Sequence, residues 1–391
     1  MPLLQKSPFF YYGDKHRLVF IIIRIMVLII VILSGIFGAS CADCGPDPET
    51  ETSVIKTLFI TDSIGLAEGD SNYVFGAVYD IAIGPTGNIF VLDVGKCHVS
   101  VFSPEGEFIQ HIARSGPGPG ELNIPGFFTV LGDGSVYIVD ANFVVKYSPE
   151  GELLAQKQTD MIDKPLWIQP IGSNDLLGVL SEYDIRDEGH FIVNRLSLWR
   201  DTTPEMPLVC FYEQEHNLSY GDFATNITRI DYFPMLFTGN NETVFLAPKP
   251  QTDPVIYSFD LSGTPCDTIF LSYEQVERTP DELSDEKVFI EQSVRINSFG
   301  QMLIDWEPDL YRPMIKAIGI GPDGNLWVQR GNQLTPVFDI LDCHGTVLFT
   351  AVLPSRQDAI YWKFRITPQG IVAFSQDPEE YQVIYQFQLK L

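Results

Sequence analysis

Residues 81–93 read Ile-Ala-Ile-Gly-Pro-Thr-Gly-Asn-Ile-Phe-Val-Leu-Asp, which is a short apolar run, a turn and a second apolar run. The same arrangement recurs in residues 128–140, 318–330 and 364–376, and in every copy a glycine falls six residues after the first residue. Two apolar runs joined by a turn are typical of a β-hairpin. Repetition of one such unit along a chain is typical of propellers and solenoids. The sequence therefore predicts an all-β fold built from repeated hairpins.

The first two hairpins belong to a longer repeat. Each is followed by two more apolar segments, which the turn Ser-Pro-Glu-Gly-Glu separates at residues 103–107 and again at residues 148–152. Proline presets the turn and glycine supplies the positive φ that ends it. The repeat therefore has four strands, as does one blade of a β-propeller. Weaker copies follow at residues 167–199 and 235–264, a fifth copy runs over residues 315–353, and a sixth begins near Tyr361.

The sixth copy has only three strands before the chain ends at Leu391. An unused apolar segment, residues 54–60, precedes the first hairpin. Propellers close their ring so that no sheet edge is left exposed. We therefore expect residues 54–60 to form the outer strand of the last blade, which gives a six-bladed propeller with four-stranded antiparallel blades. Seven blades remain an alternative if residues 294–306 contain a degenerate hairpin.

One insertion, at about residues 274–312, interrupts the repeat. It contains Thr279-Pro280-Asp281-Glu282, which combines a capping threonine, a proline at the first helical position and a glutamate three residues after the cap. This is a helix-start pattern. It predicts a helix over about residues 280–294 that projects from the propeller, with an irregular surface loop as the alternative.

The first 40 residues differ from the rest of the chain. Lys15-His16-Arg17 precede an apolar run over residues 18–37, and Gly38-Ala39-Ser40 follow it. A basic flank, an apolar stretch and small residues describe an export signal. The run is also long enough to serve as an uncleaved membrane anchor. Both interpretations place the propeller, residues 53–391, outside the cytoplasm, after a short tether at residues 41–52.

Cys41 stands directly after the small residues, as does the lipid-modified cysteine of bacterial lipoprotein signals. A lipid anchor at Cys41 is therefore one prediction, and ordinary cleavage or an uncleaved anchor is the alternative. Cys44 is close enough to serve as a disulfide partner instead. The remaining cysteines form no Cys-x-x-Cys pair, which argues against a zinc ribbon and leaves their pairing open; they are Cys97, Cys210, Cys266 and Cys343.

The chain is strongly acidic. With the four basic and one acidic side chains of residues 1–40 set aside, 21 basic and 50 acidic side chains remain, a formal charge of −29. Binding nucleic acid requires Lys and Arg to neutralise phosphates. The charge therefore argues against nucleic acid and anionic lipid as partners, and it suits a soluble exported domain.

The repeat resembles the NHL-type repeat. Residues 115–122, Ser-Gly-Pro-Gly-Pro-Gly-Glu-Leu, are followed by Pro125, the strand 128–130, the Asp133-Gly134 turn and a strand ending in Asp140, in the order of that family. The chain is similar to exported six-bladed propeller lipoproteins of bacteria. This resemblance implies a periplasmic, outer-membrane or surface location. The family includes protein-binding modules, lyases, lactonase-like hydrolases and members of unknown role, so the resemblance implies no single activity.

Residues at the start of the inner strands are the candidate ligand surface, because rigid scaffolds carry function at strand ends and loops. They combine aromatic and charged side chains, which suit a glycan or a peptide. The alternative is that they only begin strands. The candidates are Tyr79, Asp80, Trp167, Lys316, Trp362 and Lys363.

Oxygen ligands at the channel mouth would suit calcium, and Asp80 and Asp231 precede inner strands. No Glu or Asn recurs at matching positions, and the histidines do not recur there either, so we expect no cofactor and keep calcium as an alternative. Asp93 and Asp140 each end a second strand, and their repetition predicts a structural role in bonding neighbouring backbone.

The sequence thus predicts a monomeric, exported, membrane-tethered propeller that acts as a binding or scaffold module for a peptide, glycan or protein partner. The alternative is a divalent-metal-dependent hydrolase or lyase with its site in the central channel. A third possibility is a sensor or assembly protein whose projecting helix docks a partner. No catalytic residue is assigned.

Overall fold

The computed structural model describes most of the chain after residue 53. The N-terminal signal or anchor, the tether and Cys41 lie outside the described residues. No helix in the described part combines the length and the apolar character needed to cross a membrane. The described residues are 54–141, 143–159, 165–172, 175–186, 189–200, 208–218, 235–249, 253–285, 287–288, 309–354, 359, 362–375 and 381–390.

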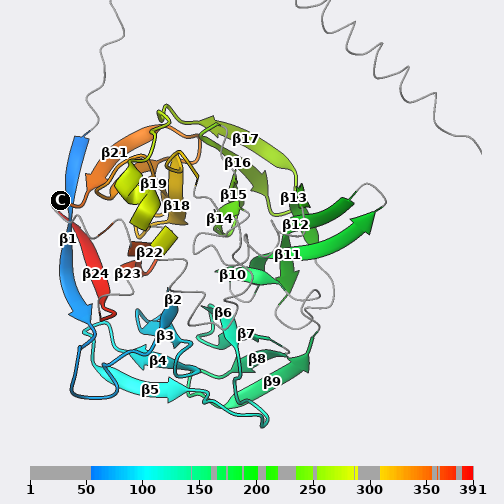
Figure 1. The fold of residues 1–391 in the computed structure, drawn as a ribbon, viewed down its shortest axis with the longest axis vertical. Helices are drawn as coiled ribbons and strands as arrows, with labels where there is room; N and C mark the ends of the chain where they lie inside the picture. Colours follow the sequence, from blue (N-terminus) through cyan, green and yellow to red (C-terminus); the bar gives the residue numbers. More distant parts are fainter. Residues whose placement is uncertain are drawn as a thin grey trace, which may run out of the picture. The chain divides into compact units, whose positions relative to one another are not determined.

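The described strands form six four-stranded antiparallel blades arranged around a common centre (Figure 1). Blades one and two contain β2 (Val78–Ile83), β3 (Ile89–Asp93), β4 (His98–Phe102), β5 (Phe108–Ile112), β6 (Pro125–Val130), β7 (Val136–Asp140), β8 (Phe143–Tyr147) and β9 (Leu153–Gln158). Blades three and four contain β10 (Leu166–Ile171), β11 (Asp175–Arg186), β12 (Gly189–Arg200), β13 (Val209–Leu218), β14 (Met235–Gly239), β15 (Thr243–Pro248), β16 (Val255–Asp260) and β17 (Pro265–Phe270). Blades five and six contain β18 (Ile315–Ile320), β19 (Leu326–Arg330), β20 (Val337–Leu341), β21 (Val347–Val352), β22 (Trp362–Thr367), β23 (Gly370–Ser375), β24 (Ile384–Lys390) and β1 (Val54–Ile64). The expected six-bladed propeller is therefore confirmed.

The two chain ends close the ring together. β1 pairs antiparallel with β24, with Leu58 opposite Leu389 and Ile64 opposite Ile384, so it is the outer strand of blade six, as the sequence predicts. β1 also pairs in parallel with β21 over residues 54–57, which the sequence did not predict. This second pairing joins blades five and six into one eight-stranded sheet. The first strand of the propeller thus bridges two blades as well as completing one.

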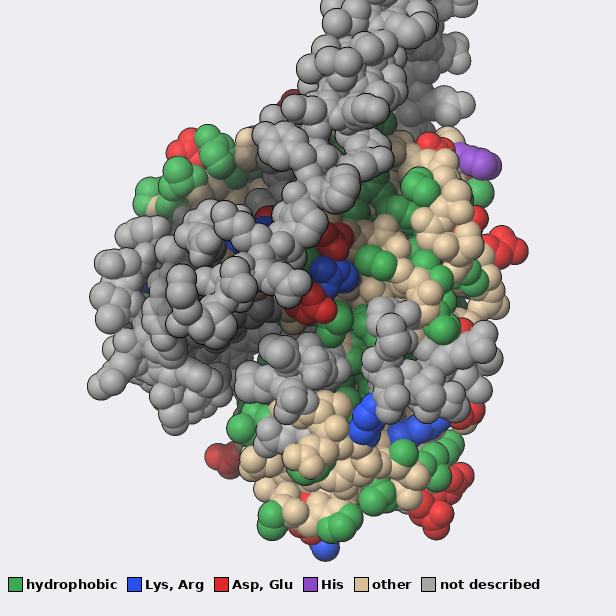
Figure 2. Space-filling model, turned by 90° about the vertical axis from the view of Figure 1, so that its right-hand side faces the viewer, with side chains coloured by type: hydrophobic (Ala, Val, Ile, Leu, Met, Phe, Trp, Pro, Cys, Tyr) green, Lys and Arg blue, Asp and Glu red, His purple; other side chains and the backbone are tan. Residues whose placement is uncertain are grey.

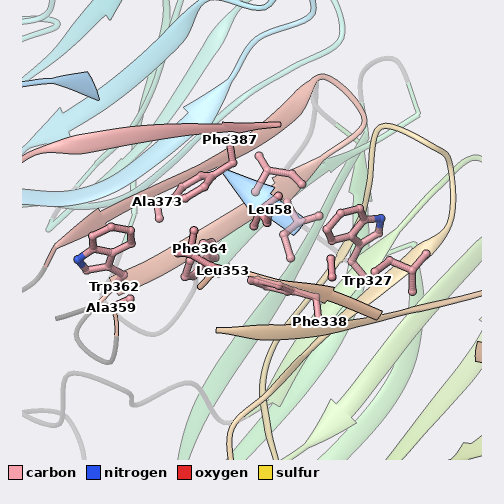
Figure 3. Packing of buried hydrophobic residues seen from close by; sticks show 13 residues of the cluster. Leu58, Trp327, Phe338, Leu353, Ala359, Trp362, Phe364, Ala373 and Phe387 are labelled. Atoms are coloured by element: carbon pink, nitrogen blue, oxygen red, sulfur yellow. The ribbon is translucent and has the colours of Figure 1, made fainter. Parts of the chain in front are cut away.

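The core consists of hydrophobic clusters between neighbouring blades. Each of the six blade-to-blade interfaces has its own cluster, so every blade is packed on both faces. Between blades five and six, Trp327 and Phe338 face Trp362 and Phe364, and Leu58 of β1 lies between the two groups (Figure 3). Phe338 and Phe364 meet edge to face, with ring centroids 5.1 Å apart. Burial of this apolar surface is the main driving force for closing the ring.

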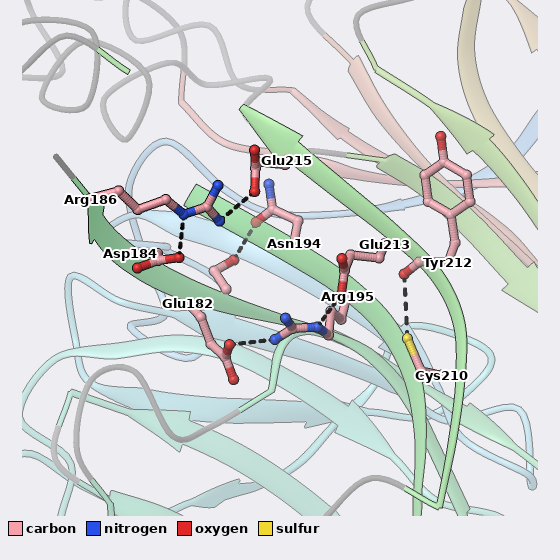
Figure 4. A network of polar contacts seen from close by, with 10 residues as sticks. Glu182, Asp184, Arg186, Asn194, Arg195, Cys210, Tyr212, Glu213 and Glu215 are labelled. Carbon is pink, nitrogen blue, oxygen red and sulfur yellow. Dashed lines mark hydrogen bonds and ion pairs between the residues drawn. The ribbon is translucent and has the colours of Figure 1, made fainter. Parts of the chain in front are cut away.

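Blade three is longer than the others. β11 and β12 have 12 residues each, whereas the corresponding strands of blades one and two have five. The ribbon extends beyond the neighbouring blades in Figure 1. Two arginines connect its strands: Arg186 bonds Asp184 at 2.7 Å and Glu215 at 2.6 Å, while Arg195 bonds Glu182 and Glu213 (Figure 4). These ion pairs are partly exposed, so each contributes little to stability, and their main effect is to hold the three strands in register.

The insertion between blades four and five begins a helix at Pro280, as the sequence predicts, and residues 280–285 and 287–288 are helical. The capping box forms: the Glu282 amide donates to Thr279 Oγ1 at 3.3 Å, and the Thr279 amide donates to Glu282 Oε2 at 2.9 Å. Arg312 Nε and Nη2 donate to Glu282 Oε1 and Oε2 at 2.8 and 2.9 Å. The end of the predicted helix and the region of the alternative seventh blade, residues 294–306, lie outside the described residues.

Arg312→Ala should release this helix from the blade. A bidentate, partly buried arginine–carboxylate pair contributes about 1.5–3 kcal/mol. Hydrogen exchange should therefore accelerate at the amides of Leu283 and Arg278, while blade amides stay protected. Lys287→Ala, an exposed change on the same helix, is the control and should leave exchange unchanged. Hydrogen bonds from Arg312 and from the Thr279 amide outweigh the effect of burial and hold the pKa of Glu282 at about 2, so the contact should persist until the pH falls toward 2.

Candidate functional site

Four inner strands carry a β-bulge near their first residues. The register shifts between Val78 and Asp80 in β2, Pro125 and Phe127 in β6, Leu166 and Gln169 in β10, and Ile315 and Ala317 in β18. The extra residues include Tyr79, Trp167 and Lys316, which are three of the six candidates from the sequence. A bulge frees a residue from the ladder and re-aims its side chain, and bulges are common beside functional sites. We call the end of the propeller where the inner strands begin the start face.

An aromatic row crosses three blades at the start face. The Tyr79 ring meets Phe127 edge-on at 5.9 Å between centroids, and Phe127 meets Trp167 at 5.3 Å. Trp167 has a φ of 49°, in the left-handed region that non-glycine residues rarely occupy. Such backbone strain is often found at binding sites. The sequence predicted Tyr79 and Trp167 but missed Phe127, which connects them.

An ion pair joins blade one to blade six beside this row. Arg365 Nε and Nη2 lie 2.8 and 2.6 Å from Asp80 Oδ1, and the Ile81 amide donates to the same oxygen at 2.9 Å. Burial alone would raise the pKa of Asp80, but Arg365 and then Lys363 hold the pKa below its ordinary value. Asp80 is therefore a charged partner of Arg365. Sequence reasoning missed Arg365, which is 285 positions from Asp80.

Lys363 places a second positive charge at the same point. Its Nζ lies 5.6 Å from the centre of the Tyr79 ring, which is within cation–π range. Burial, and next the Asp80 carboxylate, raises the pKa of the Tyr79 hydroxyl to about 12. The residue is 39% exposed. With this raised pKa, the Tyr79 hydroxyl remains a neutral hydrogen-bonding group at physiological pH.

The other candidates are placed differently. Trp362 was expected on the ligand surface, but it is 1% exposed and stacks on Tyr385 at 4.3 Å, so it belongs to the core. The reason is that alternate residues of β22 face opposite sides of the blade: Trp362 faces blade five, whereas Lys363 faces blade one and lies near Tyr79. Lys316 is half-buried on β18. Asp231 lies outside the described residues.

No group of three metal-ligating side chains is found among the described residues. His98 and His111 stack on each other in blade one, at 4.1 Å between ring centroids. Burial, and next His111, lowers the pKa of His98 to about 4, so this ring is neutral at pH 7. His111 is held by Ser100 at 3.1 Å and by Asn72 at 3.2 Å. The described cysteines, Cys97, Cys210, Cys266 and Cys343, are free thiols.

Asp93 and Asp140 have the structural role that their repetition predicts. Asp93 accepts the amides of Gly76 and Ala77 at 2.7 and 2.9 Å, and Asp140 accepts those of Asn123 and Ile124 at 2.8 and 3.0 Å. Each carboxylate thus fixes the segment that leads into the inner strand of its own blade.

Blade five reverses this arrangement. Arg330 occupies the position that corresponds to Asp93, and it bonds Asp339 of the next strand at 2.7 and 2.8 Å. Tyr273 and Thr350 also donate to Asp339, at 2.6 and 2.9 Å. The carboxylate has therefore moved to a neighbouring strand while the polar centre of the blade is retained.

The acidic side chains do not form one patch on the visible surface. Figure 2 shows them dispersed over the described part of that face, among apolar and uncharged groups. The high negative charge therefore suits solubility, and the local cations at the start face contrast with it.

Comparison with known proteins agrees with the fold. A family model described as 6-bladed beta-propeller matches residues 59–184. A Bacteroides fragilis protein that is predicted to be exported is 14% identical, with 87% of this chain and 99% of that chain covered and a TM-score of 0.48. A member of the DUF4221 family from Bacteroides vulgatus is 9% identical, with 85% and 98% covered and a TM-score of 0.49.

A gluconolactonase from Xanthomonas campestris is 11% identical, with 81% of this chain and 88% of that chain covered and a TM-score of 0.41. No curated protein matches the sequence. The matched family model and the six blades of the structure together establish that the chain folds as a six-bladed β-propeller.

Proposed function

We propose that this protein is an exported, membrane-tethered binding module whose start face recognises a peptide or glycan segment of a partner. The observation that carries the proposal is the row Tyr79, Phe127 and Trp167, which spans three blades, with Lys363 over one end. Aromatic rings give large contact areas at low entropic cost and are enriched at binding hot spots.

The topology of the last blade places the row away from the first described residue of the chain. β1 runs antiparallel to β24, so Val54 lies at the end of the propeller opposite the start of the inner strands.

Tyr79→Ala and Trp167→Ala should each weaken binding by about tenfold or more, because truncating a hot-spot aromatic typically costs 1.4 kcal/mol or above. The full-length chain is first screened on arrays of peptides and glycans, and retained ligands are titrated calorimetrically. Phe270→Ala, which removes an aromatic ring that is 78% exposed on β17, the outer strand of blade four, is the matched control. Equal affinity in all three variants would contradict the proposal.

Metal analysis of the same preparation separates the binding module from a metal-dependent enzyme. Stoichiometric calcium that is lost in Asp80→Ala or Asp231→Ala would favour the hydrolase or lyase. Since Asp80 already holds Arg365, we expect Asp80→Ala to impair stability rather than remove a metal.

A further inference from the structure

Blade one contains a pair of stacked histidines. His98 lies on β4 and His111 on the outer strand β5, and their rings are 4.1 Å apart between centroids, with 28° between the ring planes. His111 pairs with Ser100, and Ser100 shares a face of β4 with His98, so both rings lie on the same face of the blade. Phe108 also contacts the His111 ring, at 4.6 Å between centroids. The two imidazoles are therefore in direct contact, and a charge on either ring acts on the other.

The His111 ring connects the outer half of blade one to residues 70–77, which we call the entry segment because they run directly into β2 and Tyr79. Nε2 of His111 lies 3.2 Å from Asn72 Oδ1, and Nδ1 lies 3.1 Å from Ser100 Oγ. These partners suit a neutral ring with its hydrogen on Nε2, which donates to Asn72 while Nδ1 accepts the serine hydroxyl. We call this arrangement closed.

Two amides report whether the first part of the entry segment is closed. The Tyr73 amide donates to the Asp70 carbonyl at 2.9 Å, directly beside Asn72. The Phe108 amide donates to the Tyr73 hydroxyl at 3.0 Å, which links β5 to the same part of the segment. Lys96 Nζ adds a third contact, because it donates to the Ser71 carbonyl at 2.9 Å. Departure of the segment from β5 would therefore expose both amides to water.

The surroundings of the pair favour its neutral form. Burial is the largest cause that lowers the pKa of both rings, and for His98 the next cause is His111 itself. Lys96 lowers the pKa of both rings further, and Asp93 opposes it. Asp93 is fully buried and already accepts three backbone amides. The charged groups on the segments next to the two rings are Asp70, Asp93, Lys96, Arg114, Glu150 and Glu152.

The closed arrangement disfavours two charged rings. Like charges about 4 Å apart repel, and Lys96 would add a third positive charge beside them. In an opened segment each histidine would titrate near its ordinary pKa of about 6.5, so the open state binds more protons than the closed state below this pH. Closure is therefore fully stable above pH 6.5 and weakens as the pH falls toward 4. We propose that the stacked pair is an acid-sensitive latch, which holds the entry segment against blade one at neutral pH and releases it in acid.

The first test uses the full-length chain with ¹³C-labelled histidine rings. On titration, the resonances of His98 and His111 should shift in two steps at least about one pH unit apart, because the pair takes up its two protons separately. Hydrogen exchange at the Tyr73 and Phe108 amides, corrected for the intrinsic effect of pH, should be about tenfold faster or more at pH 4.5 than at pH 7. The Ile256 amide of blade four should keep its protection.

His98→Phe keeps a stacked ring but removes the second charge, so the acceleration in acid should fall below about threefold. His344→Phe replaces an exposed histidine of blade five in the same way and should accelerate as the unmodified chain does. Acceleration that persists in His98→Phe would overturn the proposal. So would a single titration step shared by both histidines, or equal protection at pH 7 and 4.5, and these two results need only the unmodified chain.

Discussion

Leu58→Ala should lower the free energy of unfolding by about 3 kcal/mol, because it removes three buried carbon atoms and leaves a cavity. Leu58 is fully buried between the aromatic groups of blades five and six, and it lies on the strand that closes the ring. The substitution leaves a cavity at an interface to which both chain ends contribute. Chemical denaturation of the full-length chain measures the loss.

Val54→Ala is the control on the same strand, because Val54 is 60% exposed at the beginning of β1. It should change stability by less than about 0.5 kcal/mol. If Leu58→Ala and Val54→Ala were equally mild, β1 would not contribute to the closed ring. The pairing of β1 with β24 and β21 would then have to be abandoned.

The blade architecture could be predicted because it is local in the sequence. The pattern that predicts each hairpin lies within 13 consecutive residues. The glycines at positions 87, 134 and 324 adopt the positive φ that their turns require. Ring closure could also be predicted by counting strands. The sixth blade lacked its outer strand, and residues 54–60 formed a strand that belonged to no other blade. The parallel contact of β1 with β21 could not, because nothing in residues 54–57 distinguishes one neighbour from two.

The candidate sites were less accessible to sequence reasoning. Tyr79, Trp167 and Lys363 were selected because they begin inner strands, but the same rule selected the buried Trp362. Alternation along a strand decides which neighbouring blade a side chain faces, and the bulges that reset this alternation have no reliable sequence signal.

Arg365→Met should destabilise the propeller by about 3–5 kcal/mol at pH 7, because it leaves the Asp80 carboxylate buried without its partner. Asp80 is 8% exposed, so water cannot replace the guanidinium. The double variant Asp80→Asn/Arg365→Met removes the stranded charge and should recover much of the loss. Chemical denaturation of the three variants measures both effects, and failure of the double variant to recover would assign the loss to packing instead.

The dependence on pH should reverse in the single variant. In the unmodified chain the folded-state pKa of Asp80 is lowered, so the unfolded state binds more protons than the folded state at acidic pH. The ion pair's contribution to stability is therefore present above the unfolded pKa of about 3.9 and is lost as the pH falls below it. Without Arg365, burial is opposed only by Lys363 and the Ile81 amide, so the pKa of Asp80 should rise relative to the unmodified chain and the folded state should take up a proton more readily. Stability of Arg365→Met relative to the unmodified chain should therefore improve as the pH falls from 7 toward 4. A constant difference in unfolding free energy between the two chains over this range would show that Arg365 does not shift the pKa of Asp80. The link between the first and last blades would then have to rest on apolar packing alone.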